Sequence, residues 1–151
     1  MLSLEATDET HSACSCTDRN RWHREAADAP GLPATKTPGG AEVYIISPRD
    51  GATVGPSVVV RFGLKGMGVA PAGMAKENTG HHHLLVDVKD LPVAGQPIPK
   101  DENHIHFGGG QTETTLTLKP GTHTLQLELG DANHVPFDPA LLSKKITIHV
   151  K

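Results

Sequence analysis

The stretch SVVVRFGL, at residues 57–64, decides the fold. Its apolar side chains recur at every second position from Val58 to Leu64. This period of two is typical of a β-strand with one face against a core, because successive side chains in a strand point to opposite faces. The polar residues Ser57 and Arg61 fall on the other face, so we expect a strand with one buried side.

Five further segments carry the same alternation, and each is short and bounded by glycine, proline, asparagine or aspartate. They lie at residues 42–47, 83–88, 114–121, 122–130 and 144–150. A seventh strand fits either residues 96–100 or residues 104–107. Seven short alternating strands in about 110 residues predict an all-β, immunoglobulin-like antiparallel β-sandwich, with a small barrel as the alternative.

Residues 1–41 show neither the strand period nor the helical period, and they end in the breaker run GLPATKTPGG. We therefore expect a disordered or processed leader at residues 1–41 and one sandwich domain at residues 42–151. No basic segment followed by an apolar segment is visible, so we expect no secretory signal. Cys14 and Cys16 form a C-x-C pair in this leader, where spare thiols are favoured over a soft-metal site.

Charge and composition exclude several classes of function. Fourteen Lys and Arg against seventeen Asp and Glu give a net charge of −3, so no basic field would attract nucleic acid. No run of 18 apolar residues occurs, so we expect no membrane span. The signatures of a nucleophile elbow, a P-loop and an H-E-x-x-H zinc site do not occur either, so we expect the protein not to be an enzyme.

Histidine is in excess, with ten copies in 151 residues. In an extended strand, side chains two positions apart point the same way, roughly 6.5–7 Å apart. His81 and His83 would therefore share one face, while His82 shares the core face. His104 and His106 would form a second pair. If the two pairs lie on neighbouring strands, three or four imidazoles converge, and such a set suits Cu(II) or Zn(II).

The long loop at residues 65–80 adds two thioethers, Met67 and Met74. Thioethers select Cu(I) over zinc, so the mixture favours copper, although packing of the loop is the alternative role for both methionines. The preferred ligands are His81, His83, His104 and His106, and the secondary candidates are Met67, Met74, His82 and His134. Carboxylates that could orient the imidazoles are Asp101, Glu102, Glu113 and Asp131.

Four blocks of the sequence stand out: GLKGMGVAPAG (63–73), NTGHHHLLVDV (78–88), DENHIHFGGGQTE (101–113) and PGTHTLQLELGDANHVPFDP (120–139). Together they resemble a bacterial family of small secreted domains of unknown function. Members of this family are similar to periplasmic immunoglobulin-like domains, and the resemblance covers residues 43–151. It implies a periplasmic or secreted location, and it brings no established activity with it.

Together these features predict a domain that binds a transition metal, copper in preference to zinc, for carriage or buffering in the bacterial envelope. Because imidazole binds metal only when neutral, the metal affinity should fall as the pH drops through about 6.5. The alternative is an envelope interaction module that recognises a protein partner and whose histidines form a structural hydrogen-bond network. An enzyme with His106 or His134 as a general base beside Glu113 is the third hypothesis.

Overall fold

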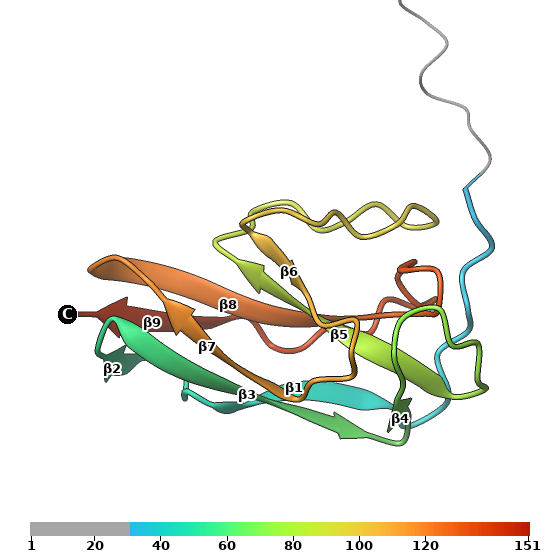
Figure 1. Ribbon diagram of the computed structural model, residues 1–151, viewed down its shortest axis with the longest axis horizontal. Coiled ribbons are helices and arrows are strands. Elements are labelled where there is room, and N and C mark those ends of the chain that lie inside the picture. The colour runs from blue at the N-terminus through green and yellow to red at the C-terminus, as the bar shows by residue number, and fades with distance from the viewer. Residues whose placement is uncertain (1–30) are drawn as a thin grey trace, which may run out of the picture. The chain divides into compact units, whose positions relative to one another are not determined.

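The computed structural model describes residues 31–151, and this part of the chain contains nine β-strands (Figure 1). The strands are β1 (Glu42–Ser47), β2 (Ala52–Val54), β3 (Ser57–Lys65), β4 (Gly68–Val69), β5 (Thr79–Val86), β6 (His104–His106), β7 (Glu113–Thr117), β8 (Gly121–Gly130) and β9 (Ile146–Val150). Within residues 31–151, no helix is long and apolar enough to cross a membrane.

The strands form two sheets. The smaller sheet has the order β1-β3-β7, with both neighbours antiparallel to β3. The larger sheet has the order β2-β9-β8-β5-β4, and β6 pairs with β5 beside β4. The central pairs β5–β8 and β8–β9 are antiparallel, whereas the short strands β2 and β4 pair in parallel with β9 and β5.

This connectivity confirms the immunoglobulin-like sandwich. In that fold the first, second and fifth strands share one sheet, and the third, sixth and seventh strands share the other. Here β1, β3 and β7 form the first set, and β5, β8 and β9 form the second. The strand β6 extends the second sheet beside β5, as the additional edge strands of variable-type domains do.

The core lies between the two sheets and is built from the alternating residues that the sequence singles out. Val58, Val60 and Phe62 of β3 are buried, whereas Val59 of the same strand is exposed. The larger sheet contributes its own buried aliphatic residues: Leu84, Val86, Leu125, Leu127, Leu129, Ile146, Ile148 and Val150. Each such side chain contributes roughly 1.5–3 kcal/mol through burial, so the core needs few aromatic rings.

The outer face of the larger sheet is also covered, and this cover positions the candidate site. All residues of β5 from Gly80 to Val86 are buried, so β5 has no solvent-facing side. The chain after β8 folds back along it, with isolated bridges joining Gly130 to Pro136 and Glu128 to Leu142. Ile98 from the segment between β5 and β6 is buried as well.

The structure differs from the sequence prediction in several elements. The seventh strand is β6, one of the two predicted alternatives. The strands β2 and β4 were not predicted, because two or three residues are too few to show a period. Residues 31–41 were assigned to the leader, but Leu32 and Thr37 donate backbone hydrogen bonds to Gly95 and Asp138. The rest of the predicted leader, with Cys14 and Cys16, lies outside the described residues.

Candidate metal centre

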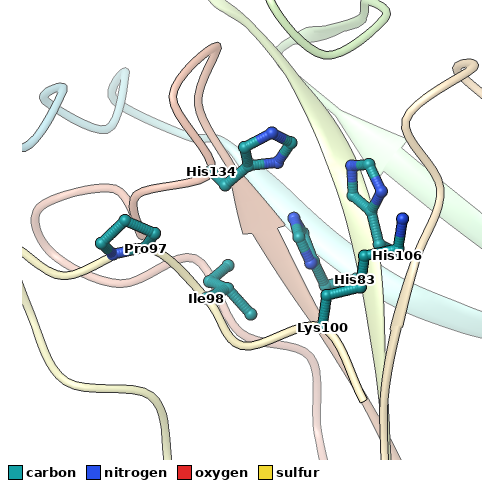
Figure 2. Close-up of a pocket in the computed structure, with 6 residues that line it drawn as sticks. All are labelled: His83, Pro97, Ile98, Lys100, His106 and His134. Carbon is teal, nitrogen blue, oxygen red and sulfur yellow. The ribbon is translucent and has the colours of Figure 1, made fainter. Parts of the chain in front are cut away.

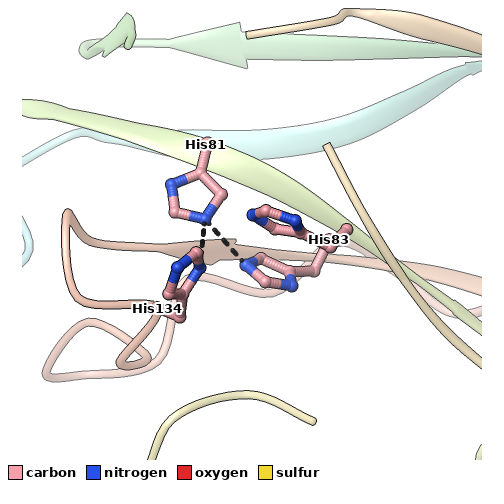
Figure 3. A group of neighbouring side chains, drawn as sticks. His81, His83 and His134 are labelled. Carbon is pink, nitrogen blue, oxygen red and sulfur yellow. Dashed lines mark hydrogen bonds between the residues drawn. The ribbon is translucent and has the colours of Figure 1, made fainter. Parts of the chain in front are cut away.

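Four histidines converge on the covered outer face of the larger sheet. One ring nitrogen from each of His81, His83, His106 and His134 lies within 4.8 Å of the corresponding nitrogens of the other three. The rings of His83, His106 and His134 face a common pocket (Figure 2). The His81 Nε2 atom lies 3.0 Å from His134 Nδ1 and 3.0 Å from His83 Nε2 (Figure 3).

Strand geometry places three of these rings. His81 and His83 stand two residues apart on β5, so both project to the outer face. His106 of β6 is the direct partner of His83 across the antiparallel pair. Side chains directly opposite each other on neighbouring strands lie on the same face, and here the two ring centroids are 5.1 Å apart.

The fourth ring comes from a turn that Asp131 holds in place. The Asp131 Oδ1 atom accepts hydrogen bonds from the backbone N–H groups of Asn133 and Val135, and its Oδ2 atom accepts one from the Thr35 hydroxyl. His134 has a φ of 65°, in the left-handed region that residues other than glycine adopt at a cost of about 1 kcal/mol or more. The turn therefore fixes the histidine backbone in a strained conformation.

Two glycines make room for the rings. A Cβ atom added at Gly130 would lie 2.9 Å from His83 Nε2. A Cβ atom added at Gly108 would lie 2.3 Å from Cε1 of His106. Both positions therefore favour glycine for steric reasons. The neighbouring Gly110 has a φ of 80° and donates a backbone hydrogen bond to Phe107, in a turn at the corner after β6.

Burial keeps the imidazoles of His81, His83 and His106 neutral. Desolvation, reinforced by the neighbouring rings, lowers the pKa of His81 to about 4 and the pKa of His83 to about 2. Desolvation also lowers the pKa of His106, with smaller effects from His134 and Lys100. Imidazole binds a metal ion through the lone pair of its neutral form, so these shifts leave the rings ready for coordination at neutral pH.

The spacing of the nitrogens is compatible with one metal ion. Imidazole nitrogens bind zinc at about 2.0–2.1 Å, so two nitrogens on one ion lie at most about 4.2 Å apart. The two separations of 3.0 Å satisfy this limit. In a tetrahedral arrangement the nitrogens lie about 3.3–3.4 Å apart, so the limit of 4.8 Å for the whole group requires a closure of at most about 1.5 Å. The cluster could therefore bind a single transition-metal ion after side-chain movements of this size.

The structure corrects the prediction for His104, which lies outside the four-histidine group. Its Nδ1 atom is 2.8 Å from the Asp101 carboxylate, which also accepts the backbone N–H groups of Asn103 and His104. The tight turn before β6 thus holds the ring at the start of this three-residue strand. Asp101 therefore orients His104, and it does not orient any of the four histidines of the candidate centre.

The other secondary candidates also lie apart from the four rings. His82 points into the core, with its ring centroid 5.2 Å from that of Phe62. Met67 packs against the hydrophobic core. Met74 is 54% exposed and lines a second pocket, together with Thr79 and Asp131. The thioether argument for copper therefore finds no support in the positions of the two methionines.

The remaining predicted carboxylates have different surroundings. Glu113 forms an exposed ion pair with Arg61, at 3.2 Å. Glu102 is exposed in the turn before β6. Asp131 is buried beneath His134, and its charge acts on His81, where it opposes part of the lowering of the pKa. Of the four predicted carboxylates, Asp131 is the one with a positioning role at the centre.

Glu128 is a feature that the sequence did not reveal. It is the direct partner of His83 across the β5–β8 pair, it is 1% exposed, and its Oε2 atom has no hydrogen-bond partner among the described residues. Burial raises its pKa to about 7. In the sequence it alternates with leucines as an ordinary solvent-facing residue would, and the segment that covers it is not recognisable from that pattern.

Fold and site together define a class: an immunoglobulin-like β-sandwich with a four-histidine candidate metal centre on the outer face of one sheet. The chain belongs to the family described as Domain of unknown function (DUF4399), whose model matches residues 60–151. The match includes all four histidines of the centre, and it confirms the predicted membership of a family of unknown function. Searches of curated proteins and of solved structures gave no match.

Proposed function

We propose that this protein binds a copper ion at His81, His83, His106 and His134, and carries or buffers the ion in the bacterial envelope. The observation that carries the proposal is the convergence of four ring nitrogens within 4.8 Å. Among divalent ions of the first transition row, Cu(II) binds a given set of nitrogen ligands most tightly. The envelope location rests on the resemblance of the sequence blocks to secreted domains.

The proposed role is binding without turnover. Four protein ligands are the number found in structural metal sites, whereas catalytic zinc sites use three protein ligands and one water. The same four imidazoles also suit Zn(II), which is therefore the competing ion. Direct competition between the two ions under one buffer condition decides between them.

The alternative is a structural hydrogen-bond network in an envelope interaction module. The two contacts of 3.0 Å favour it, because each has the length of a hydrogen bond. However, both contacts use the same atom, His81 Nε2, and an imidazole nitrogen offers either one proton or one lone pair. The Nε2 atom of His106 is also buried and has no partner among the described residues, whereas the Nδ1 atoms of His81 and His83 stay unpaired in either account. A network that shares His81 Nε2 between two contacts and leaves His106 Nε2 unpaired is costly, so metal binding is the better account.

Metal titration of the untagged full-length chain tests the proposal. We expect one Cu(II) per chain, with higher affinity than for Zn(II), measured against a competing chelator. The variant H106A/H134A removes two half-buried ligands and should weaken copper binding by more than about 100-fold. The control H104A/H123A removes two histidines that carboxylates hold elsewhere, and should leave the affinity unchanged within about threefold.

The structural-network alternative predicts a different result. Protein purified without added ions would contain no metal, and copper would raise the melting temperature of neither the wild type nor H106A/H134A. Equal loss of copper affinity in H106A/H134A and in H104A/H123A would also contradict the proposed centre. Circular dichroism of each variant checks that the sandwich is still folded.

A further inference from the structure

A pocket opens beside the four-histidine centre. It has a volume of about 170 Å³ and is lined by His83, Pro97, Ile98, Lys100, His106 and His134 (Figure 2). Three of the four proposed ligands thus form one wall. Pro97 and Lys100 are exposed, so the pocket reaches the surface. A water molecule occupies about 30 Å³ in the liquid, so the space is large enough for a molecule of several heavy atoms.

The pocket places a positive charge beside the centre. The Lys100 ammonium group acts on His106 and contributes to the lowering of its pKa. No salt bridge to Lys100 occurs within residues 31–151. The side chain therefore has a free charge at the rim of a pocket whose wall is formed by metal-binding imidazoles.

The charge balance of the loaded centre leaves room for an anion. Four neutral imidazoles bring no negative charge to a divalent ion, and Asp131, whose charge acts on His81, compensates only part of its +2 charge. Lys100 adds a further positive charge on the open side, which by itself opposes the metal ion. One small anion in the pocket, between the metal ion and Lys100, would stabilise both charges.

We propose that the pocket is a subsite for a small monovalent anion, which coordinates the bound metal ion and faces the Lys100 ammonium group. This inference rests on the proposed metal function, because the anion needs the metal ion as its main partner. Ile98 and Pro97 provide the apolar remainder of the wall. The volume of about 170 Å³ limits the subsite to a small anion, which would join the four imidazoles as a fifth, exchangeable ligand of the metal ion.

Azide is the probe, and the copper-loaded full-length protein is the sample. We expect azide to produce a saturable azide-to-copper charge-transfer absorption. The variant K100Q should weaken azide binding by about two- to fivefold, the range of exposed charge pairs, and K100E should weaken it further. K100R keeps the charge and should restore the affinity. Lys119 lies at the opposite end of β8, in the turn between β7 and β8, so K119Q is a control for the loss of one exposed lysine.

Two results would overturn the subsite. The first is copper binding at full stoichiometry with no charge-transfer band on addition of azide. The second is an equal azide affinity in the wild type, K100Q, K100E and K119Q. Failure of the proposed metal function is distinguishable, because the protein would then bind no copper in the titration that precedes the addition of azide.

Discussion

The three adjacent histidines of β5 point to opposite faces of the sheet, so His82 has different surroundings from His81 and His83. His81 and His83 face the candidate metal centre, whereas His82 packs on Phe62 in the core. The His82 side chain is fully buried, and neither ring nitrogen has a partner in hydrogen-bonding geometry among the described residues. Burial lowers its pKa to about 4, and the backbone of Gln111 opposes part of that shift. A buried polar group in this state costs stability.

Replacing His82 with leucine should therefore stabilise the protein. Leucine has a similar size and brings no polar atoms into the core, so H82L should raise the free energy of unfolding at pH 7 by about 1–2 kcal/mol. Copper affinity should change by less than about twofold, because the ring does not face the centre. Urea unfolding and copper titration check both parts. A clear loss of stability in H82L would show that the ring makes a contact that the structure does not contain.

For single residues, the sequence predicted some members of the candidate centre. The two-residue period correctly separated His82 from His81 and His83, because strand alternation is a local property. The same argument placed His104 and His106 on one face, but His104 pairs with Leu85 and not with His83, and its ring contacts Asp101 instead of the other histidines. His134 was a secondary candidate, since its position depends on the turn around Asp131 and not on a periodic pattern.

The burial of the rings also changes the expected pH range of metal binding. From the sequence alone, protons compete with metal near pH 6.5, the ordinary pKa of histidine. The pKa of His81 is about 4 and that of His83 about 2. These two candidate ligands therefore stay neutral well below pH 6.5, and for them proton competition would begin at a lower pH than the sequence suggests.

Among the elements, the corner after β6 determines where His106 lies. Gly108 faces the His106 ring so closely that even a methyl group would displace it. The substitution G108A should lower copper affinity by about tenfold or more, because the ring must rotate away from the other three. At Gly109, an added Cβ meets the flexible end of Gln111 at 3.0–3.2 Å, so G109A is a matched control with a small effect.

Copper titration and circular dichroism of both glycine variants check this prediction. Equal copper affinities in G108A and G109A would show that the His106 ring is not needed in its observed position. A loss of folding in G108A alone, without metal, would instead assign the glycine to the stability of the corner.

The strands themselves were largely predictable, whereas their contacts were not. Six of the strands follow from local alternation between apolar and polar residues. The parallel pairing of β2 with β9 joins segments far apart in sequence, and β4, which pairs in parallel with the next strand β5, is too short to show a period. The segments that cover β5 from outside have no strand period, so the burial of His81, His83 and Glu128 was not visible in the sequence.

For the whole molecule, the buried titratable groups predict how stability depends on pH. His81, His82 and His83 have lowered pKa values in the folded state, so the unfolded chain binds more protons than the folded one below pH 6.5. Their contribution to stability is present above about pH 6.5 and is lost as the pH falls towards about 4 and lower. Glu128 has the opposite sign: its pKa is raised to about 7, so its contribution is present below about 4.5 and is lost as the pH rises to 7.

The free energy of unfolding of the metal-free protein should therefore fall between pH 6.5 and pH 4, because three histidines outweigh one carboxyl group. His82 alone contributes roughly 3 kcal/mol to this fall. Urea unfolding across this range measures the profile, and H82L should have a visibly shallower slope. A stability that rises steadily from pH 6.5 to pH 4 in the wild type would contradict the buried neutral state of the triplet.

The most direct test of the four-histidine centre is X-ray absorption spectroscopy of the copper-loaded, untagged protein. We expect a shell of four imidazole nitrogens at about 2.0 Å around one copper ion per chain, and a loss of two of them in H106A/H134A. A shell dominated by oxygen, or a spectrum that H106A/H134A leaves unchanged while H104A/H123A alters it, would contradict the convergence of these four rings on one metal ion.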